Sequence, residues 1–183
     1  MNYNETGSVC KAEERIWIAF YTRPRFEVSI ATQLKKIGIE SYVPLRRECH
    51  HWSDRRKWVN IPLIPSYVFV CLEIRNYFRV LSINGVIRPV MFNGRIARIH
   101  EQDIELLRKI ENADESVEIV TQDFHRMDEV EIVKGIFTGY RGHVVSEGSK
   151  YKIGISIKEI EYSLVIEVPI SVIRLKSKSV LVS

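Results

Sequence analysis

The pattern of apolar and polar positions divides the first part of the chain into alternating strands and helices. Runs rich in β-branched and aromatic residues predict strands at 16–22, 39–45, 61–72 and 86–92. Apolar residues at spacings of three and four predict helices near 26–37, 74–81 and 104–110. This order of elements predicts an α+β fold, a ferredoxin-like α/β sandwich with its helices on one face of a mixed sheet.

The run IPLIPSYVFVCL (61–72) departs from the pattern of a sheet with one solvated face. A half-exposed strand alternates apolar with polar residues, whereas this run is apolar or aromatic on both sides. The face without helices is expected to carry Trp17, Tyr21, Tyr67 and Phe69. Either a second layer of the same chain covers this face, or a partner docks there.

The rest of the chain changes character. Five short runs rich in Val, Ile and Tyr, separated by glycines and Pro169, predict a small all-β, SH3-like barrel at 127–176. The acidic segment 111–126 has no Gly or Pro and is predicted to be a solvated linker. We therefore expect an N-terminal extension (1–15), a first domain (16–110), the linker, the barrel and a tail (177–183).

Charge separates the two predicted domains. The net charge of +4 over 183 residues is +7 for residues 1–110 (18 Lys and Arg against 11 Asp and Glu) and −3 for residues 111–183 (9 against 12). The first domain is therefore predicted to face an anionic partner. Three cysteines without a CxxC pair, and the lack of a secretory signal or of about 20 consecutive apolar residues, predict a cytoplasmic protein without membrane contact. We expect a monomer.

No arrangement of residues predicts catalysis. Cys49, His50 and His51 are adjacent, but no third and fourth ligand stand at a usual metal-site spacing. The same residues with Asp54 lie within six positions, whereas catalytic triads usually draw residues from separate elements. No glycine run has phosphate-loop spacing. The sequence predicts no metal site, no cofactor and no enzyme.

Basic residues give a stronger indication. A predicted hairpin at 46–60 interleaves five of them with two tryptophans, and two more precede the first helix; the basic residues are Arg46, Arg47, Arg55, Arg56, Lys57, Arg23 and Arg25. Cations engage phosphates, and indole rings stack on unpaired bases, so this pattern predicts nucleic-acid contact. In the alternative interpretation the arginines solvate the hairpin, and Trp52 and Trp58 form a cross-strand pair.

Four segments resemble the N-terminal domain of the NusG family of transcription elongation factors. They are WIAFYTRPRFE, GIESYVPL, RKWVNIPLIPSYVFV and INGVIRPVMF, and they are most similar to its RfaH-like and UpxY-like antiterminators. The later segment VEIVKGIFTGYRGHVV resembles the KOW motif of the family's small barrel. The resemblance covers residues 16–176.

The resemblance implies a transcription elongation or antitermination factor that binds RNA polymerase. In the family an aromatic face binds the clamp helices of the largest subunit, and the opposite end contacts the second large subunit across the DNA cleft. The residues at matching positions are Trp17, Tyr21, Ile64, Tyr67, Phe69 and Phe92. Contact with the non-template DNA strand would use Arg23 and Arg25, with Arg79 near the following loop; the part of the hairpin is inferred from its charge.

The resemblance also implies a second contact through the KOW segment. Phe137 and Tyr140 flank its turn and are candidates for binding a ribosomal protein or another factor. In RfaH-like members this segment can refold as a helical hairpin that masks the polymerase site, but β-branched residues and glycines predict a barrel here. The alternative function is that of a KOW-type ribosome- or RNA-binding structural protein, which the net charge of −3 disfavours.

Overall fold

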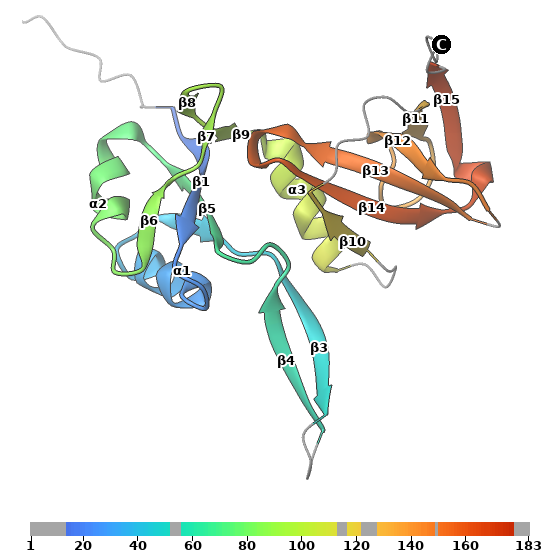
Figure 1. The fold of residues 1–183 in the computed structure, drawn as a ribbon. Coiled ribbons are helices and arrows are strands. Elements are labelled where there is room, and N and C mark those ends of the chain that lie inside the picture. The colour runs from blue at the N-terminus through green and yellow to red at the C-terminus, as the bar shows by residue number, and fades with distance from the viewer. Residues whose placement is uncertain (1–13, 52–55, 113–116, 122–127, 149, 178–183) are drawn as a thin grey trace, which may run out of the picture.

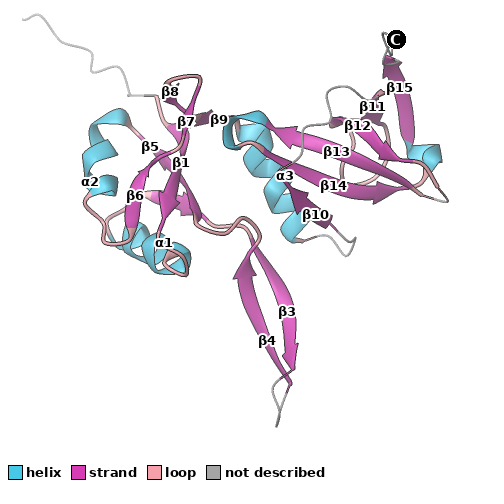
Figure 2. Cartoon of the chain, viewed as in Figure 1, coloured by secondary structure: helices cyan, strands magenta, loops and turns pink. Residues whose placement is uncertain are grey.

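The structure is a computed structural model that describes residues 14–51, 56–112, 117–121, 128–148 and 150–177. Figure 1 shows two modules side by side and a long hairpin that projects away from both. We call the part from β1 to α3 the N-terminal module and the part from β10 to β15 the C-terminal module. Strands dominate both, and the helices belong chiefly to the N-terminal module (Figure 2).

A five-stranded sheet forms the centre of the N-terminal module. Its order is β2-β5-β1-β6, with β9 also paired to β1. The strands are β1 (Ile16–Thr22), β2 (Glu40–Tyr42), β5 (Tyr67–Leu72), β6 (Val86–Pro89) and β9 (Arg98–Ile99). All their pairings are antiparallel, so the prediction of a mixed sheet is wrong. Two hairpins leave this sheet: β3 (Leu45–His51) with β4 (Arg56–Pro62), and β7 (Met91–Phe92) with β8 (Arg95–Ile96).

Two helices cover one face of this sheet, as the sequence predicted. They are α1 (Glu27–Lys36) and α2 (Tyr77–Leu81), which follows the 3₁₀ turn η1 (Ile74–Asn76). Ile30, Leu34 and Val80 from these helices pack against Phe20 and Val70 of the sheet, and all five are 0% exposed. Burying large aliphatic and aromatic side chains at this density is the main stabilising contribution of such a layer.

The third helix, α3 (Glu101–Glu111), lies on the opposite face. Its buried residues Ile104, Leu106, Leu107 and Ile110 belong to the same apolar cluster as Trp17, Tyr67 and Phe69. The prediction that all helices share one face is therefore wrong. The 3.6-residue period gives the apolar side of a helix, but not the side of the sheet on which it packs.

The C-terminal module is a six-stranded antiparallel sheet in the order β10-β14-β13-β12-β11-β15. Its strands are β10 (Val117–Val120), β11 (Glu129–Ile132), β12 (Arg141–Ser146), β13 (Tyr151–Ile157), β14 (Tyr162–Val168) and β15 (Ile173–Ser177), with 3₁₀ turns η2 (Lys158–Ile160) and η3 (Ile170–Val172). The five predicted strands are present. The described pairings leave the strand order open at β10 and β15, so they do not close a barrel.

Strand β10 comes from the segment that was predicted to be a solvated linker. Residues Val117 to Val120 pair with Ser163 to Ile166 of β14. The prediction of a fully solvated linker is therefore wrong for this stretch. Its apolar residues Val117, Ile119 and Val120 gain cross-strand contacts by extending the edge of the sheet.

Glycine is required at one position of the C-terminal sheet. Gly142 of β12 packs so closely on β13 that a Cβ atom there would lie 2.6 Å from the carbonyl oxygen of Gly154. Gly139, in the preceding turn, has a φ of +89°, which glycine adopts without the usual penalty. Gly139 therefore serves the turn, whereas Gly142 allows close packing of two strands.

We predict that Gly142→Ala lowers the free energy of unfolding by about 1–3 kcal/mol, because backbone atoms cannot yield to the added methyl group. Gly148→Ala is the matched control, since its nearest atom would lie at an ordinary contact distance of 3.5 Å. Urea unfolding followed by circular dichroism measures both variants. Equal stability of the two would contradict the packing of β12 on β13.

Candidate functional site

The ring-bearing residues singled out in the sequence come together on one face of β1 and β5. In the antiparallel register Trp17 is opposite Cys71, Ala19 opposite Phe69, and Tyr21 opposite Tyr67. The Tyr67 hydroxyl donates a hydrogen bond to the Tyr21 hydroxyl at 3.0 Å. We call this surface, with the nearby Ile64 and Phe92, the aromatic face.

Helix α3 covers one part of the aromatic face and is fixed to it at both ends. The Trp17 indole Nε1 donates a hydrogen bond to the Glu101 carboxylate at 2.6 Å, and the Tyr42 hydroxyl donates to the Glu111 carboxylate at 2.8 Å. The guanidinium of Arg108 lies 5.8 Å from the centroid of the Trp17 ring and 5.5 Å from that of Tyr42. Hydrogen bonds to carboxylates are stronger than neutral ones, so these contacts hold α3 firmly on the sheet.

The C-terminal module covers the rest of this face. The ring of Tyr162 meets Tyr67 edge-on, with centroids 5.6 Å apart. Tyr140 donates a hydrogen bond from its hydroxyl to the backbone carbonyl of Gln102 at 3.2 Å, and Lys109 Nζ lies 4.7 Å from the Tyr140 ring centroid. His100 Nε2 lies 3.6 Å from a carboxylate oxygen of Glu159. We call this boundary the seam (Figure 1).

The question raised by the sequence is thus answered: a second layer of the same chain covers the aromatic face. Tyr67 and Trp17 are each 5% exposed, and Ile64 and Phe69 are 0% exposed. Tyr21 and Phe92 are half-buried. A partner could reach Tyr67 only after the C-terminal module has moved away, whereas α3 covers Trp17.

The two residues expected to bind a second partner do not present free surfaces either. Phe137 is 3% exposed and packs in the core of its own module. Tyr140 is half-buried at the seam. The turn that carries both residues therefore serves packing and the seam in this conformation.

The seam contains a carboxyl group whose ionisation opposes closure. Burial, and then the neighbouring Glu159, raise the pKa of Asp103 to about 6, while His100 lowers it by a smaller amount. Burial also raises the pKa of the Tyr140 hydroxyl, with Glu105 and Asp103 adding to the effect. Deprotonated Asp103 thus faces Glu159, a group of like charge, across the seam.

The predicted arginines at the start of α1 lie on a tightly built turn. Arg23 and Arg25 are exposed, and Arg25 has the left-handed φ of +69°. The Arg23 backbone N–H donates to the carbonyl of Gly85 at 2.8 Å. The Ser66 N–H donates to the buried carboxylate of Glu27 at 2.7 Å. These bonds fix the backbone, so that both cations project into solvent from a rigid base.

One further arginine was missed in the sequence. Arg88 of β6 is exposed and lies 4.6 Å from the ring centroid of Tyr21, a distance typical of a cation–π contact. Arg79 by contrast bonds to Asn76 at 3.0 Å and to the carbonyl of Ile37 at 3.5 Å. Arg88 could be recognised only from the strand pairing that places it beside Tyr21, because the two residues are distant in sequence.

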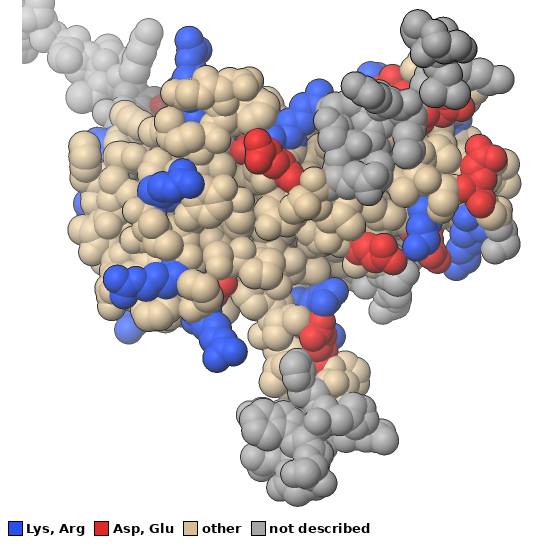
Figure 3. Space-filling model, viewed as in Figure 1, with Lys and Arg blue, Asp and Glu red and all other residues tan. Residues whose placement is uncertain are grey.

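The hairpin arginines form a separate group. Arg46 pairs with Glu48, whereas Arg47 lies 5.5 Å from the ring centroid of Trp58. Arg55 lies outside the described residues, and Arg56 and Lys57 are placed in β4 by their backbone only. Figure 3 shows Lys and Arg spread over the N-terminal module, with most of the visible Asp and Glu at the seam and on the C-terminal module.

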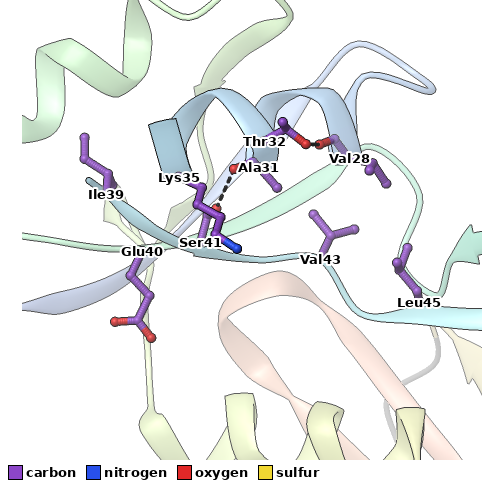
Figure 4. Close-up of a pocket in the computed structure, with 9 residues that line it drawn as sticks. All are labelled: Val28, Ala31, Thr32, Lys35, Ile39, Glu40, Ser41, Val43 and Leu45. Atoms are coloured by element: carbon purple, nitrogen blue, oxygen red, sulfur yellow. Dashed lines mark hydrogen bonds between the residues drawn. The ribbon is translucent and has the colours of Figure 1, made fainter. Parts of the chain in front are cut away.

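A separate groove lies beside α1. A groove of about 460 Å³ runs between α1 and the β2–β3 segment, and its walls are mainly aliphatic: Val28, Ala31, Thr32, Lys35, Ile39, Glu40, Ser41, Val43 and Leu45 (Figure 4). Ser41 and Thr32 both donate their hydroxyls to backbone carbonyls of α1. Within the described residues no three His, Cys, Asp or Glu side chains are grouped to hold a metal. No described helix is long and apolar enough to cross a membrane.

Comparison with known proteins defines the class. The family model described as "Transcription termination factor nusG" matches residues 15–108, which is more than half of the chain. The protein therefore belongs to the NusG family of transcription factors, as the quoted segments indicated. A search of curated proteins found no match.

One solved structure supports this fold. The structure titled "Domain interaction in Thermotoga maritima NusG" is similar over 91% of this chain and 98% of its own, with 17% identity and a TM-score of 0.52. Conformations B and A of the MjSpt4:Spt5 complex also match at 17% identity, over 90% and 89% of this chain and 99% of each matched chain, with TM-scores of 0.31 and 0.30.

We predict that closure at the seam weakens as pH rises from about 4 to about 6. The pKa of Asp103 is raised from 3.8 to about 6 in the closed form, so the closed form is favoured while this group is protonated and loses that advantage as the group ionises. Asp103→Asn should raise the ratio of closed to open molecules above pH 6 by roughly tenfold, less than the full shift because the carboxyl is only half-buried.

Energy transfer between fluorophores on the two modules, followed across this pH range, measures the closed fraction. Glu105→Gln is the matched control, because Glu105 lies on the same helix but remains exposed. Asp103→Asn removes the titrating carboxyl group, so it should flatten the dependence of the closed fraction on pH over this range. An unaltered pH profile in this variant would contradict the assignment.

Proposed function

We propose that the protein is a transcription elongation or antitermination factor that binds RNA polymerase through the aromatic face. The observation that carries the proposal is the position of this face: in a NusG-family module, Trp17, Tyr21 and Tyr67 form a contiguous apolar surface whose cover includes a separate module. A central aromatic cluster with a polar rim is what a tight protein interface needs. The binding partner would be the clamp helices of the largest polymerase subunit.

The described conformation is then a masked form. The C-terminal module, rather than α3, is the cover that would move, since α3 is tied to the sheet through Glu101 and Glu111 at its two ends. The other end of the N-terminal module would contact the second large subunit and so bridge the DNA cleft. The protein would act in the cytoplasm as a monomer without a cofactor. Its binding would favour processive transcription of particular operons.

Exposed cations support contact with the non-template DNA strand. Arg23 and Arg25 would engage phosphates from the turn before α1, with Arg88 beside them and Arg79 in a lesser role. The hairpin adds Arg47, Arg55, Arg56 and Lys57, whereas the charge of Arg46 is paired with Glu48. After opening, the C-terminal module would bind a second factor or a ribosomal protein through Tyr140 and the turn that contains Phe137. Its acidic balance disfavours the alternative of a ribosome- or RNA-binding structural protein.

We predict opposite effects of two tyrosine substitutions on capture by core RNA polymerase. Tyr67→Ala removes part of the binding surface and should abolish capture. Tyr162→Ala removes the ring that covers Tyr67 and should raise capture by roughly two- to tenfold, because an aromatic pair contributes about 0.5–1.5 kcal/mol beyond the area it buries.

Immobilised full-length protein and purified core polymerase suffice for this measurement. Tyr151→Ala is the control for the loss of a tyrosine from the C-terminal module, since its strand partner, Val168, lies within that module. Cooperative unfolding of each variant must first be verified. Undiminished capture by Tyr67→Ala would remove the proposed polymerase site.

We predict that the double substitution Arg23→Ala and Arg25→Ala flattens the salt dependence of binding to an open DNA bubble. Each lost phosphate contact on a single strand should reduce the slope of log affinity against log salt by about 0.7. Lys35→Ala with Lys36→Ala is the matched control, because it removes two exposed cations from the other end of α1. Equal slopes for the two double variants would exclude the turn as a DNA contact.

A further inference from the structure

The β3–β4 hairpin is built as an arm rather than as part of a core. Its two strands pair with each other over seven residue pairs, from Leu45 opposite Pro62 to His51 opposite Arg56, and belong to no larger sheet. Figure 1 shows the arm reaching away from the N-terminal sheet and from the seam. An isolated two-stranded hairpin gains little stability from burial. Its side chains are therefore not needed for a core and can contact a partner.

Trp58 is exposed on this arm. It is 61% exposed, although an indole ring is among the largest apolar surfaces that a side chain can bury. Its cross-strand partner is Cys49, and Trp52, with which it was expected to pair, lies outside the described residues. Packing of the hairpin therefore does not account for the ring.

The two faces of the arm differ in charge. Successive residues of a strand point to opposite faces, so Arg46 and Glu48 share one face and Arg47 lies on the other. Arg46 is neutralised locally by its ion pair with Glu48. Arg47, diagonal to Trp58 in the register, has its guanidinium 5.5 Å from the centroid of the indole ring. One face therefore presents an aromatic ring together with a cation whose described contact is that ring.

We propose that this face of the arm binds an unpaired nucleic-acid strand, with a base stacked on the Trp58 ring and the adjacent phosphate held by Arg47. A cation over one side of an indole leaves the other side available to a base, and stacking accepts any base because each has a π-face. Duplex DNA keeps its bases stacked on one another and offers none to the ring. This proposal refines the nucleic-acid contact of the proposed function: the arm selects the unpaired strand.

Two DNA probes of the same sequence, one single-stranded and one duplex, test the selection by fluorescence anisotropy with the full-length protein at low ionic strength. Trp58→Ala should weaken binding of the single strand about tenfold and leave the duplex unchanged. Trp58→Tyr should retain most of the affinity, because its ring still stacks. Arg47→Ala should weaken binding of both probes, whereas Arg46→Ala, whose charge is already paired, should change either much less.

Equal affinities of Trp58→Ala and the unaltered protein for the single strand would overturn the proposal, as would an equal loss on both probes or no binding of either probe by the unaltered protein. Because Trp58 is exposed, its replacement should leave the unfolding transition in place. Polymerase capture separates this test from that of the aromatic face: Trp58→Ala should be captured normally, and Tyr67→Ala should retain its preference for the single strand.

Discussion

The structure depends on one constraint: β5 is apolar on both sides, so both faces of the sheet that contains it must be covered. The helices α1 and α2 satisfy one face with aliphatic side chains. The other face carries rings at Trp17, Tyr67 and Phe69, and it is covered jointly by α3 and by a module that begins after α3. The arrangement of the two modules follows from this second face.

The two parts of that cover differ in how they are held. Helix α3 is anchored by hydrogen bonds to two carboxylates, at Glu101 and Glu111, which would lose their partners if the helix left. The C-terminal module is held by ring contacts and by a hydrogen bond to a backbone carbonyl, with Asp103 half-buried near Glu159. A cover that includes a like-charge pair is less stable than its apolar contacts alone would make it. If polymerase binds the aromatic face, its apparent affinity falls by the fraction of molecules that are open.

Most helices and strands could be predicted from the sequence, because local patterns of residues determine them. The β-branched and aromatic run at 16–22 and the apolar spacing at Ile104, Leu107 and Ile110 predicted β1 and α3 correctly. Short runs rich in Val, Ile and Tyr predicted the five strands β11 to β15. What failed was the placement of elements against one another: the side of the sheet on which α3 lies, and the pairing of β10 with β14. Those outcomes follow from which apolar surfaces meet in three dimensions.

At the candidate site too, the sequence identified the residue types but not their contacts. The sequence identified the rings as an unusual surface but did not show what covers them, because Tyr162 and Tyr67 are separated by about half of the chain. It grouped all the basic residues by charge alone, whereas the structure distinguishes Arg46, which is paired, from Arg47, which lies over Trp58. The exposed cations at Arg23 and on the hairpin remain accessible in the closed form, while the rings do not. Electrostatic attraction acts over about 10 Å and does not require the C-terminal module to move. The closed form can therefore contact an anionic strand, whereas contact through the rings requires the open form.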